Sequence, residues 1–547
     1  MTADLILLNA DIRTMDPTLP GATALAVRNG RVLALGGTDA IAALAGPGTR
    51  TIDAGGRLVL PGFQDAHVHL LDGGTDMVSG AALWEVETVE ALLDAMAAHA
   101  ARWSGPLVLG SGWQAGIFGE HNLTAALLDR AVPDRPCLIY DSSYHSACAN
   151  SAALRMAGID EATADPETGH IVRDRAGRAT GMLHEAATSL VRDRLPATED
   201  TTRIAGLRAG QAHANRHGIT GIVDPLVDHH HARAYAALAA EDALTLRVSG
   251  AGIVRPEDSV ETALERLLGW RAAHSGPLFH VNAAKFFLDG VLENRTAALI
   301  APYADAAGGN APLMFAPDQI AALFTAIDAA RFQIHVHVIG DLAARAALDG
   351  LEAARAANTP WPALAQLAHL QLVDPADFVR IARLGAMANI QPLWARHDTV
   401  VPDEWIDMIG PDRLPFAYAF RRMIDAGAPF CLSSDFPVST LNPFEIIETA
   451  VTRQPRRRDG NRPPFLPAER LSVAEAVAGY TCHAARACWR GDTTGRLLPG
   501  LSADLVLLDR DIFRCPAHEI GDTEVLLTLF RGRAVWRHDS FDGGDTE

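Results

Sequence analysis

The sequence predicts an α/β protein whose central part is a (β/α)8 barrel of the TIM type. From about residue 216 to 480, short apolar runs alternate with helical stretches, a pattern typical of βα units around a parallel sheet. Both ends of the chain instead show short strands separated by hairpin signals. Because the termini of a domain often lie close together, we expect the two ends to form one β-sandwich beside the barrel.

The length of the chain indicates more than one domain. It has 547 residues, 48% of them hydrophobic, which exceeds what a single compact core normally serves. We expect residues 1–60 and 490–547 to form the composite β-sandwich, and residues 61–75 and 206–489 to form the barrel. Residues 76–205 would be an α/β insertion after the first barrel strand that covers the functional site.

The strands can be assigned in chain order. In the sandwich, the strands expected are residues 4–8, 24–27, 31–35 and 503–508, and then residues 526–536, which Arg531-Gly532-Arg533 interrupts as a hairpin. The first barrel strand is expected to run from residues 58–60 through Pro61-Gly62-Phe63 to His67. The other seven are residues 219–223, 245–253, 281–288, 333–339, 365–372, 386–390 and 430–434.

The charge balance restricts the class of partner. With 66 acidic and 47 basic residues, the formal net charge is -19, which disfavours binding to nucleic acid or to an anionic membrane. No stretch reaches the roughly 18 apolar residues of a membrane span, and the first ten residues fall short of a signal peptide. Six cysteines without CxxC spacing fit a reducing cytoplasm. We therefore expect a cytoplasmic protein with a small-molecule substrate, and the composition leaves a homodimer open.

Lys285 is the only lysine among the 47 basic residues, and it lies in the apolar run of residues 280–288. A charged side chain is rarely buried without a partner. Arginine could replace lysine as a charge but not as a neutral amine, because the pKa of the guanidinium is too high. This difference predicts a chemical role for Lys285, against the simpler interpretation of a chance survivor on a solvated face.

Metal-competent side chains follow several of the predicted barrel strands. In Asp65-Ala-His67-Val-His69, the two histidines are two residues apart, so both can reach one ion from an extended strand. Taken alone, such a pair is more often two satisfied polar histidines. Lys285 lies on the fourth strand, however, and His337, His369 and Asp435 end the fifth, sixth and eighth. A shared metal at the carboxyl ends of the strands would satisfy all of these buried polar groups.

These residues resemble the amidohydrolase superfamily, and several further segments resemble its YtcJ-like branch, which includes N-substituted formamide deformylase. The segments span nearly the whole chain. They are Gly110-Ser-Gly-Trp113, residues 145–154, Asp289-Gly290, Arg295-Thr296, residues 337–341, residues 369–373, Gln391-Pro392 and Ser434-Asp435. Gln64 and Leu370 depart from the usual pattern, which places an apolar residue and alanine there; neither change removes a ligand.

The resemblance implies one or two divalent metal ions, with zinc the best match to imidazole and carboxylate ligands and manganese or iron as substitutes. His67, His69 and Asp435 would bind one ion, His337 and His369 the second, and Lys285 would bridge them as its carbamate. Hydroxide formed between the ions would then attack a carbonyl carbon while Asp435 transfers the proton to the departing amine.

The resemblance also implies that His145, Trp113 and Gln391 contact the substrate, with His145 stabilising its oxyanion. For His145 and Trp113, a purely structural role is the alternative. The pair His184-Glu185, His335 and residues 229–231 are metal-competent as well. A place on the surface, packing or a supporting role is the simpler interpretation for each, because the ligand positions are already filled.

The reaction expected is hydrolysis of a C–N amide bond in an N-substituted formamide or another N-acyl amine. A deaminase or a cyclic-amide hydrolase of the same superfamily is the main alternative. Deaminases typically carry a glutamate three residues after the strand-five histidine, where this chain has Gly340. A non-catalytic binding or regulatory protein is the alternative from another class, but the intact ligand set argues against it.

Overall fold

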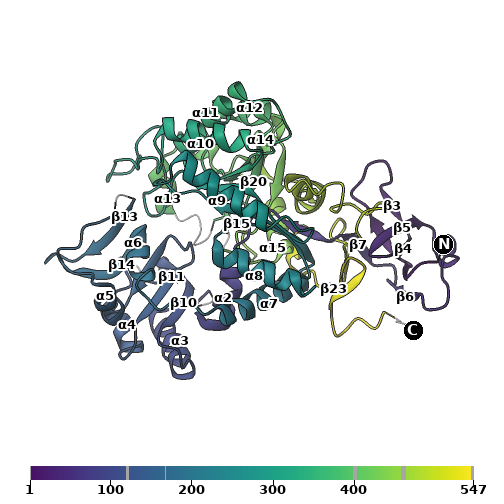
Figure 1. Cartoon of the computed structure of the whole chain (residues 1–547), viewed down its shortest axis with the longest axis horizontal. Coiled ribbons are helices and arrows are strands. Elements are labelled where there is room, and N and C mark those ends of the chain that lie inside the picture. The colour runs from purple at the N-terminus through teal and green to yellow at the C-terminus, as the bar shows by residue number, and fades with distance from the viewer. Residues whose placement is uncertain are drawn as a thin grey trace.

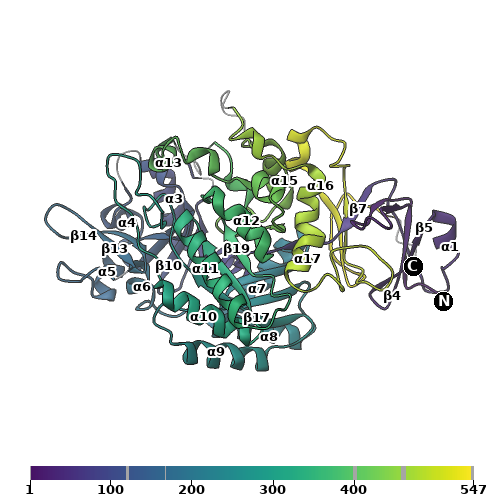
Figure 2. The same cartoon turned by 90° about the horizontal axis from the view of Figure 1, so that it is seen from above.

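The computed structural model describes residues 2–84, 86–118, 122–166, 168–397, 403–456 and 463–543. An eight-stranded parallel barrel occupies the centre of the molecule (Figure 1). The insertion lies at one end, and the strands from both chain termini lie at the other (Figures 1 and 2). The predicted fold class is therefore confirmed, whereas the residue boundaries of the three parts stay a prediction.

The barrel sheet has the strand order β21-β20-β19-β18-β17-β16-β15-β8. Backbone hydrogen bonds beyond the two edge strands bring the sheet almost to closure, because the amides of Ala66, His69 and Asp435 bond across to carbonyls of the facing segment. The strands are β8 (Phe63–Asp65), β15 (Ile219–Val227), β16 (Arg247–Ile253), β17 (Phe279–Phe287), β18 (Gln333–Val338), β19 (Gln366–His369), β20 (Met387–Ile390) and β21 (Phe430–Leu432).

Helices cover the outside of the barrel (Figure 2). The sequence of α12 (Pro375–Leu384) shows how they form: Asp374 caps its first turn, Pro375 occupies the first helical position, and Gly385 ends it in a left-handed conformation. The others are α7 (Asp200–Arg216), α8 (His229–Ala240), α9 (Val260–Ala273), α10 (Pro317–Ala329), α11 (Asp341–Ala357), α13 (Asp403–Ile409), α14 (Phe420–Asp425), α15 (Pro443–Thr452), α16 (Val473–Ala478) and α17 (Ala484–Ala487).

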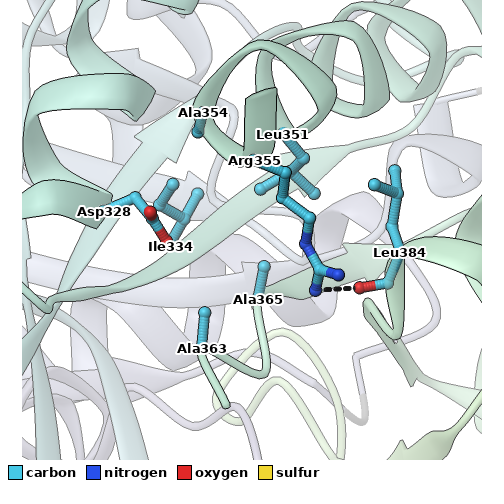
Figure 3. Close-up of a pocket in the computed structure, with 8 residues that line it drawn as sticks. All are labelled: Asp328, Ile334, Leu351, Ala354, Arg355, Ala363, Ala365 and Leu384. Carbon is cyan, nitrogen blue, oxygen red and sulfur yellow. Dashed lines mark hydrogen bonds between the residues drawn. The ribbon is translucent and has the colours of Figure 1, made fainter. Parts of the chain in front are cut away.

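A small cavity of about 10 Å³ lies between the barrel sheet and these helices (Figure 3). It is lined by Ile334, Leu351, Ala354 and Leu384 among others, and the Arg355 guanidinium donates to the Leu384 carbonyl beside it. Because side chains alternate along a strand, Ile334 points away from the face that carries His335 and His337. The cavity therefore belongs to the outer packing of the barrel and not to the candidate site, and it holds one water at most.

Both chain termini contribute strands to one six-stranded sheet, ordered β24-β23-β22-β7-β2-β3. It shares an apolar core with a four-stranded sheet, β5-β4-β1-β6. The strands are β1 (Leu5–Leu8), β2 (Asp11–Arg13), β3 (Gly21–Ala22), β4 (Ala24–Arg28), β5 (Arg31–Gly36), β6 (Arg50–Asp53), β7 (Leu58–Pro61), β22 (Leu505–Leu508), β23 (Val525–Phe530) and β24 (Arg533–Arg537), with α1 (Thr38–Ala42) beside them.

Residues 58–60 were expected both within the sandwich segment 1–60 and at the start of the first barrel strand, and the second of these assignments is wrong. These residues form β7, which lies between β2 and β22 in the terminal sheet, and the barrel strand β8 begins only after Gly62. At Gly62 a Cβ atom would lie 2.3 Å from the Thr220 hydroxyl oxygen, so the chain passes very close to β15 there. One continuous apolar run thus serves two sheets, and its hydrophobic pattern does not mark the change.

The insertion contains its own six-stranded sheet, ordered β13-β14-β12-β11-β10-β9. It begins beyond α2 (Leu70–Ser79), which follows His69 directly and packs closely on α7, since a Cβ on Gly74 would lie 2.2 Å from the Gly206 carbonyl oxygen. Its elements are β9 (Gly80–Ala82), α3 (Val89–Arg102), β10 (Val108–Trp113), α4 (Ala125–Ala131), β11 (Cys137–Asp141), β12 (Ser146–Ala149), α5 (Ser151–Ala157), β13 (Gly169–Arg173), β14 (Ala179–Glu185) and α6 (Ala187–Arg192).

Within the described ranges, no helix combines the length and the apolar character needed to cross a membrane.

Candidate metal centre

Three predicted ligands converge at the carboxyl ends of the barrel strands. His67, His369 and Asp435 are buried, and one ligand atom from each lies within 4.8 Å of the others. Asp435 Oδ1 is 3.4 Å from His67 Nε2 and 3.3 Å from His69 Nε2, and Asp435 Oδ2 is 4.0 Å from His369 Nδ1. The structure therefore brings both histidines of the HxH pair to the carboxylate that ends the eighth strand.

His337 lies beside this group, at the end of β18. Its ring centroid is 4.5 Å from that of His369, and its Nε2 lies 3.1 Å from the Gly290 carbonyl oxygen. The Asp289 carboxylate, 4.0 Å from the same nitrogen, accepts hydrogen bonds from the backbone amides of Ala298, Ile339 and Gly340. Asp289 thus fixes the backbone turns that follow β17 and β18.

Lys285 is fully buried on β17, with its Nζ 4.4 Å from the centroid of the Phe287 ring. Among the residues that the structure describes, Nζ has no hydrogen-bond partner, and neither has Asp435 Oδ1. Burial lowers the pKa of Lys285 to about 7, although the carboxylates of Asp435 and Asp224 oppose the shift. Within the described part of the chain, the amine and this carboxylate oxygen are thus buried without hydrogen-bond partners, and the oxygen faces the imidazoles of His67 and His69. These are features that a bound cation would satisfy.

The imidazoles themselves fit a cation. Burial is the main cause that lowers the pKa of His67, His337 and His369, so the neutral form of each is favoured. Neutral imidazole is the form that coordinates metals. Histidine nitrogens with a carboxylate oxygen are a donor set suited to zinc and to neighbouring divalent metals.

Two of these residues occupy unusual backbone conformations. His369 has a φ of 82° and Asp435 a φ of 56°, both in the left-handed region that favours glycine. Such conformations cost about 1–3 kcal/mol each and persist where the surrounding structure enforces them, often at functional sites. Here the Asp435 amide donates to the His67 carbonyl at 2.9 Å, which ties the turn after β21 to the HxH segment.

His145 reaches this region from the insertion. Its ring centroid lies 5.4 Å from that of His337, and its Nδ1 is 2.8 Å from Glu185 Oε2. Burial opposes a charge on the imidazole, but the Glu185 carboxylate outweighs it and raises the pKa of His145 to about 9. Glu185 also accepts a hydrogen bond from the Thr296 hydroxyl at 2.7 Å, which joins the insertion to the loop after β17. The sequence marks Glu185 only as a metal-competent neighbour of His184, and its pairing with His145 was missed because no spacing relates the two residues.

The two other predicted substrate contacts have different surroundings. Trp113 is 1% exposed in the core of the insertion, where its ring packs edge-on against Phe118 and its indole nitrogen lies 3.4 Å from the Ile139 carbonyl oxygen. Gln391 lies in the barrel, with its Oε1 3.1 Å from His369 Nδ1. The structure therefore places Gln391 next to the candidate centre, whereas the contacts described for Trp113 lie within the insertion.

The family model with the description "Amidohydrolase family" matches residues 50–536. The chain is 29% identical over 500 residues to the putative amidohydrolase YtcJ of Bacillus subtilis, covering 90% of this chain and 91% of the relative. It is also 29% identical to N-substituted formamide deformylase of Arthrobacter pascens, covering 97% of each. An uncharacterized metal-dependent hydrolase from Pyrococcus furiosus is a solved structural neighbour, with a TM-score of 0.73, 26% identity, and coverage of 93% of this chain and all of that one.

These similarities extend over the barrel, the insertion and most of the terminal strands, as the resemblance to the YtcJ-like branch predicts. With the metal-competent cluster at the carboxyl ends of the barrel strands, they identify the chain as a member of the amidohydrolase family.

Proposed function

We propose that this metal-dependent hydrolase cleaves the C–N amide bond of a small N-acyl amine, such as an N-substituted formamide. The observation that carries the proposal is the convergence of His67, His369 and Asp435 within 4.8 Å. The buried Lys285 amine interacts electrostatically with both histidines and has no hydrogen-bond partner among the residues that the structure describes. Similarity to a deformylase over 97% of both chains supports this choice of substrate class.

The ligand assignment is part of the proposal. His67, His69 and Asp435 would hold one divalent ion, and His337 and His369 a second, with zinc as the ion that suits these donors best. Lys285, as the carbamate that its neutral amine forms with carbon dioxide, would complete the set of ligands that holds them. The buried position of its amine and the absence of a hydrogen-bond partner in the described part of the chain support this role.

Divalent ions at this site would lower the pKa of a water molecule and polarise the substrate carbonyl group. The carboxylate of Asp435 would take the water proton and deliver it to the nitrogen of the leaving amine. A C–O bond forms and the C–N bond breaks, so the products are a carboxylic acid, formic acid for a formamide, and a free amine.

His145 would stabilise the charge that develops on the substrate oxygen. Glu185 occupies its Nδ1 at 2.8 Å, which leaves Nε2 to donate a hydrogen bond. A donor fixed in place before the reaction stabilises an oxyanion without further reorganisation. Gln391 and Trp113 would act at a greater distance from the reacting atoms, since their described contacts are with other protein groups.

The structure has no space for the glutamate that a deaminase typically carries three residues after the strand-five histidine. A Cβ atom built on Gly340 would lie 2.1 Å from the backbone carbonyl oxygen of Ala298, so no side chain fits at the position where deaminases carry glutamate. This close approach favours amide hydrolysis over deamination of a heterocycle.

The test is a hydrolysis screen of the metal-loaded protein. The panel contains N-substituted formamides, longer N-acyl amines, cyclic amides and aminated heterocycles, and the release of acid and amine is measured for each. We expect turnover of open-chain amides, and none by Asp435→Asn. Turnover confined to aminated heterocycles, with release of ammonia, would instead support the deaminase alternative.

A further inference from the structure

A chain of buried amide side chains runs through the interior of the barrel and ends at His369. Its members are Gln333, Gln366, Asn389 and Gln391, none of which is more than 4% exposed, together with the fully buried Ser433. They belong to four neighbouring parts of the sheet, from the start of β18 to the segment after β21. We name this set the amide chain.

The lower end of the amide chain is fixed by backbone carbonyls. Gln333 Nε2 donates to the Leu364 carbonyl at 2.7 Å and to the Ala487 carbonyl at 2.8 Å. A carbonyl oxygen can only accept, so this end of the Gln333 amide must be its NH2 group. Gln333 Oε1 therefore faces the next member, Gln366 Nε2, at 3.0 Å.

A second carbonyl fixes the middle of the amide chain. Asn389 Nδ2 donates to the Ala66 carbonyl at 2.9 Å and to Gln366 Oε1 at 2.8 Å. Ala66 immediately precedes His67, so the same amide also holds the segment that carries the HxH pair. Asn389 Oδ1 is left to accept hydrogen bonds from the members of the amide chain that lie nearer His369.

The upper end follows from these constraints. Asn389 Oδ1 accepts from the Ser433 hydroxyl at 2.6 Å and from Gln391 Nε2 at 3.2 Å, and Gln391 Nε2 also donates to Ser433 Oγ at 2.7 Å. The NH2 group of Gln391 is therefore directed at Ser433 and Asn389. Its Oε1 must face His369 Nδ1, which lies 3.1 Å away.

The amide chain thereby selects one tautomer of His369. Because Gln391 Oε1 cannot donate, His369 Nδ1 must carry the proton, and the lone pair is on Nε2. His337 is fixed in the opposite sense, since its Nε2 faces the Gly290 carbonyl oxygen and must carry the proton itself. Two neighbouring imidazoles thus present different nitrogens as ligands.

We propose that Gln391 is a positioning residue that, through the amide chain, holds His369 as the Nδ1–H tautomer with Nε2 free to bind a metal ion. This inference rests on the proposed metal-dependent function. A hydrogen bond to the second nitrogen of a metal-binding histidine fixes its tautomer and its orientation, and the loss of such a partner typically reduces metal affinity by about 10–100-fold.

The test measures metal affinity separately from activity. Zinc affinity is determined by competition with a chromophoric chelator, and the absorption spectrum of the cobalt-loaded protein reports the ligands of the ion. We expect Gln391→Leu, which removes the acceptor, to weaken the binding of one ion by about 10–100-fold. Gln391→Glu, which restores an acceptor for Nδ1–H, should bind the ion more tightly than Gln391→Leu does.

Gln211→Leu is the matched control. Gln211 on α7 is also buried, and both ends of its amide are bonded, to the Ala243 carbonyl at 3.0 Å and the Thr245 amide at 3.2 Å. This variant should lose thermal stability while keeping the zinc affinity and the cobalt spectrum. Gln391→Met, which keeps the side-chain length without the acceptor, replaces Gln391→Leu if the latter does not fold.

The outcomes distinguish a failure of the proposed metal-dependent function from a failure of the positioning role of Gln391. Wild-type protein that binds no stoichiometric metal would overturn the proposed function. Wild-type protein that binds metal, with unchanged affinity and spectrum in the Leu and Met variants, would overturn the positioning role alone. A Glu variant that binds no better than the Leu variant would also overturn it.

Discussion

Asp435 contacts three of the histidines in the candidate centre. Its carboxylate lies within 4.0 Å of imidazole nitrogens of His67, His69 and His369, and its amide bonds to the His67 carbonyl. The adjacent Ser434 amide donates to Asp65, so this turn is held on both sides. Replacing the carboxylate by an amide of the same shape therefore tests chemistry and leaves the packing almost unchanged.

We expect Asp435→Asn to lower kcat by at least about 100-fold, because the amide cannot accept the water proton. Circular dichroism and the melting temperature should remain close to those of the wild type. Turnover within a few-fold of the wild type, measured on the best amide from the screen, would remove Asp435 from its proton-transfer role.

Lys285→Arg should lose one metal ion and nearly all activity, although it conserves the charge. Arginine cannot present the neutral amine that a carbamate requires. Lys285→Ala should be partly rescued by added acetate or formate, because these can supply the missing oxygens between the ions. Elemental analysis and initial rates provide the measurement, and Lys285→Arg with normal metal content and rate would show that the lysine is structural.

His217, partly buried at the end of α7, should make stability depend on pH. Burial, with the neighbouring His213 and Arg216, lowers the pKa of His217 from 6.5 to about 3. Between these values the unfolded chain binds a proton that the native state does not, so the free energy of unfolding falls as the pH falls. Urea unfolding of His217→Gln across this window should show a shallower decline, and parallel profiles for the two proteins would contradict this assignment.

At the scale of elements, the sequence predicted the barrel strands well, because buried parallel strands appear as separate apolar runs between helices. All seven strands after the first lie at or within a few residues of their expected ranges, such as residues 333–339 against Gln333–Val338. The exception was the first, where Gly62 divides one apolar run between two sheets.

The candidate site was predictable only in part. His67, His369 and Asp435 could be identified because each ends a strand, and strand ends meet at one edge of a barrel. Glu185 and the amide chain could not, because their roles depend on contacts between segments far apart in sequence, as in the hydrogen bond of Asn389 to Ala66. Hydrophobic periodicity carries no information about such pairs.

Gly340→Ala should destabilise the turn between β18 and α11. The added Cβ would lie 2.1 Å from the backbone oxygen of Ala298, which cannot move without disturbing the loop after β17. Overpacking of this kind costs about 1–3 kcal/mol in the free energy of unfolding. Gly269→Ala is the control, because Gly269 lies in α9 with open space around its Cβ position and should be neutral or stabilising. Equal stability of both variants in urea titrations would contradict the close approach at Gly340.

At the scale of the whole molecule, metal loading should raise thermal stability. The candidate ligands come from both ends of the barrel sheet, β8 and the segment after β21, so an ion bound between them ties the sheet closed. A ligand that binds only the native state stabilises it by mass action. We expect about two ions per chain by elemental analysis, and a lower melting temperature after exhaustive chelation. Full activity and an unchanged melting temperature after chelation would contradict the metal-dependent proposal.

The place of β7 has a consequence for biosynthesis. Gly62 alone separates β7 from β8, and the Gly62 amide donates a hydrogen bond to the backbone carbonyl of Asp504. Strand β22, which pairs with β7, directly follows Asp504 at residues 505–508. A ribosome releases the amino-terminal segment first, so His67 and His69 emerge while the strand that anchors their approach has not yet been translated. We therefore expect the approach to these two histidines to gain its full set of strand partners only after β22 has been synthesised.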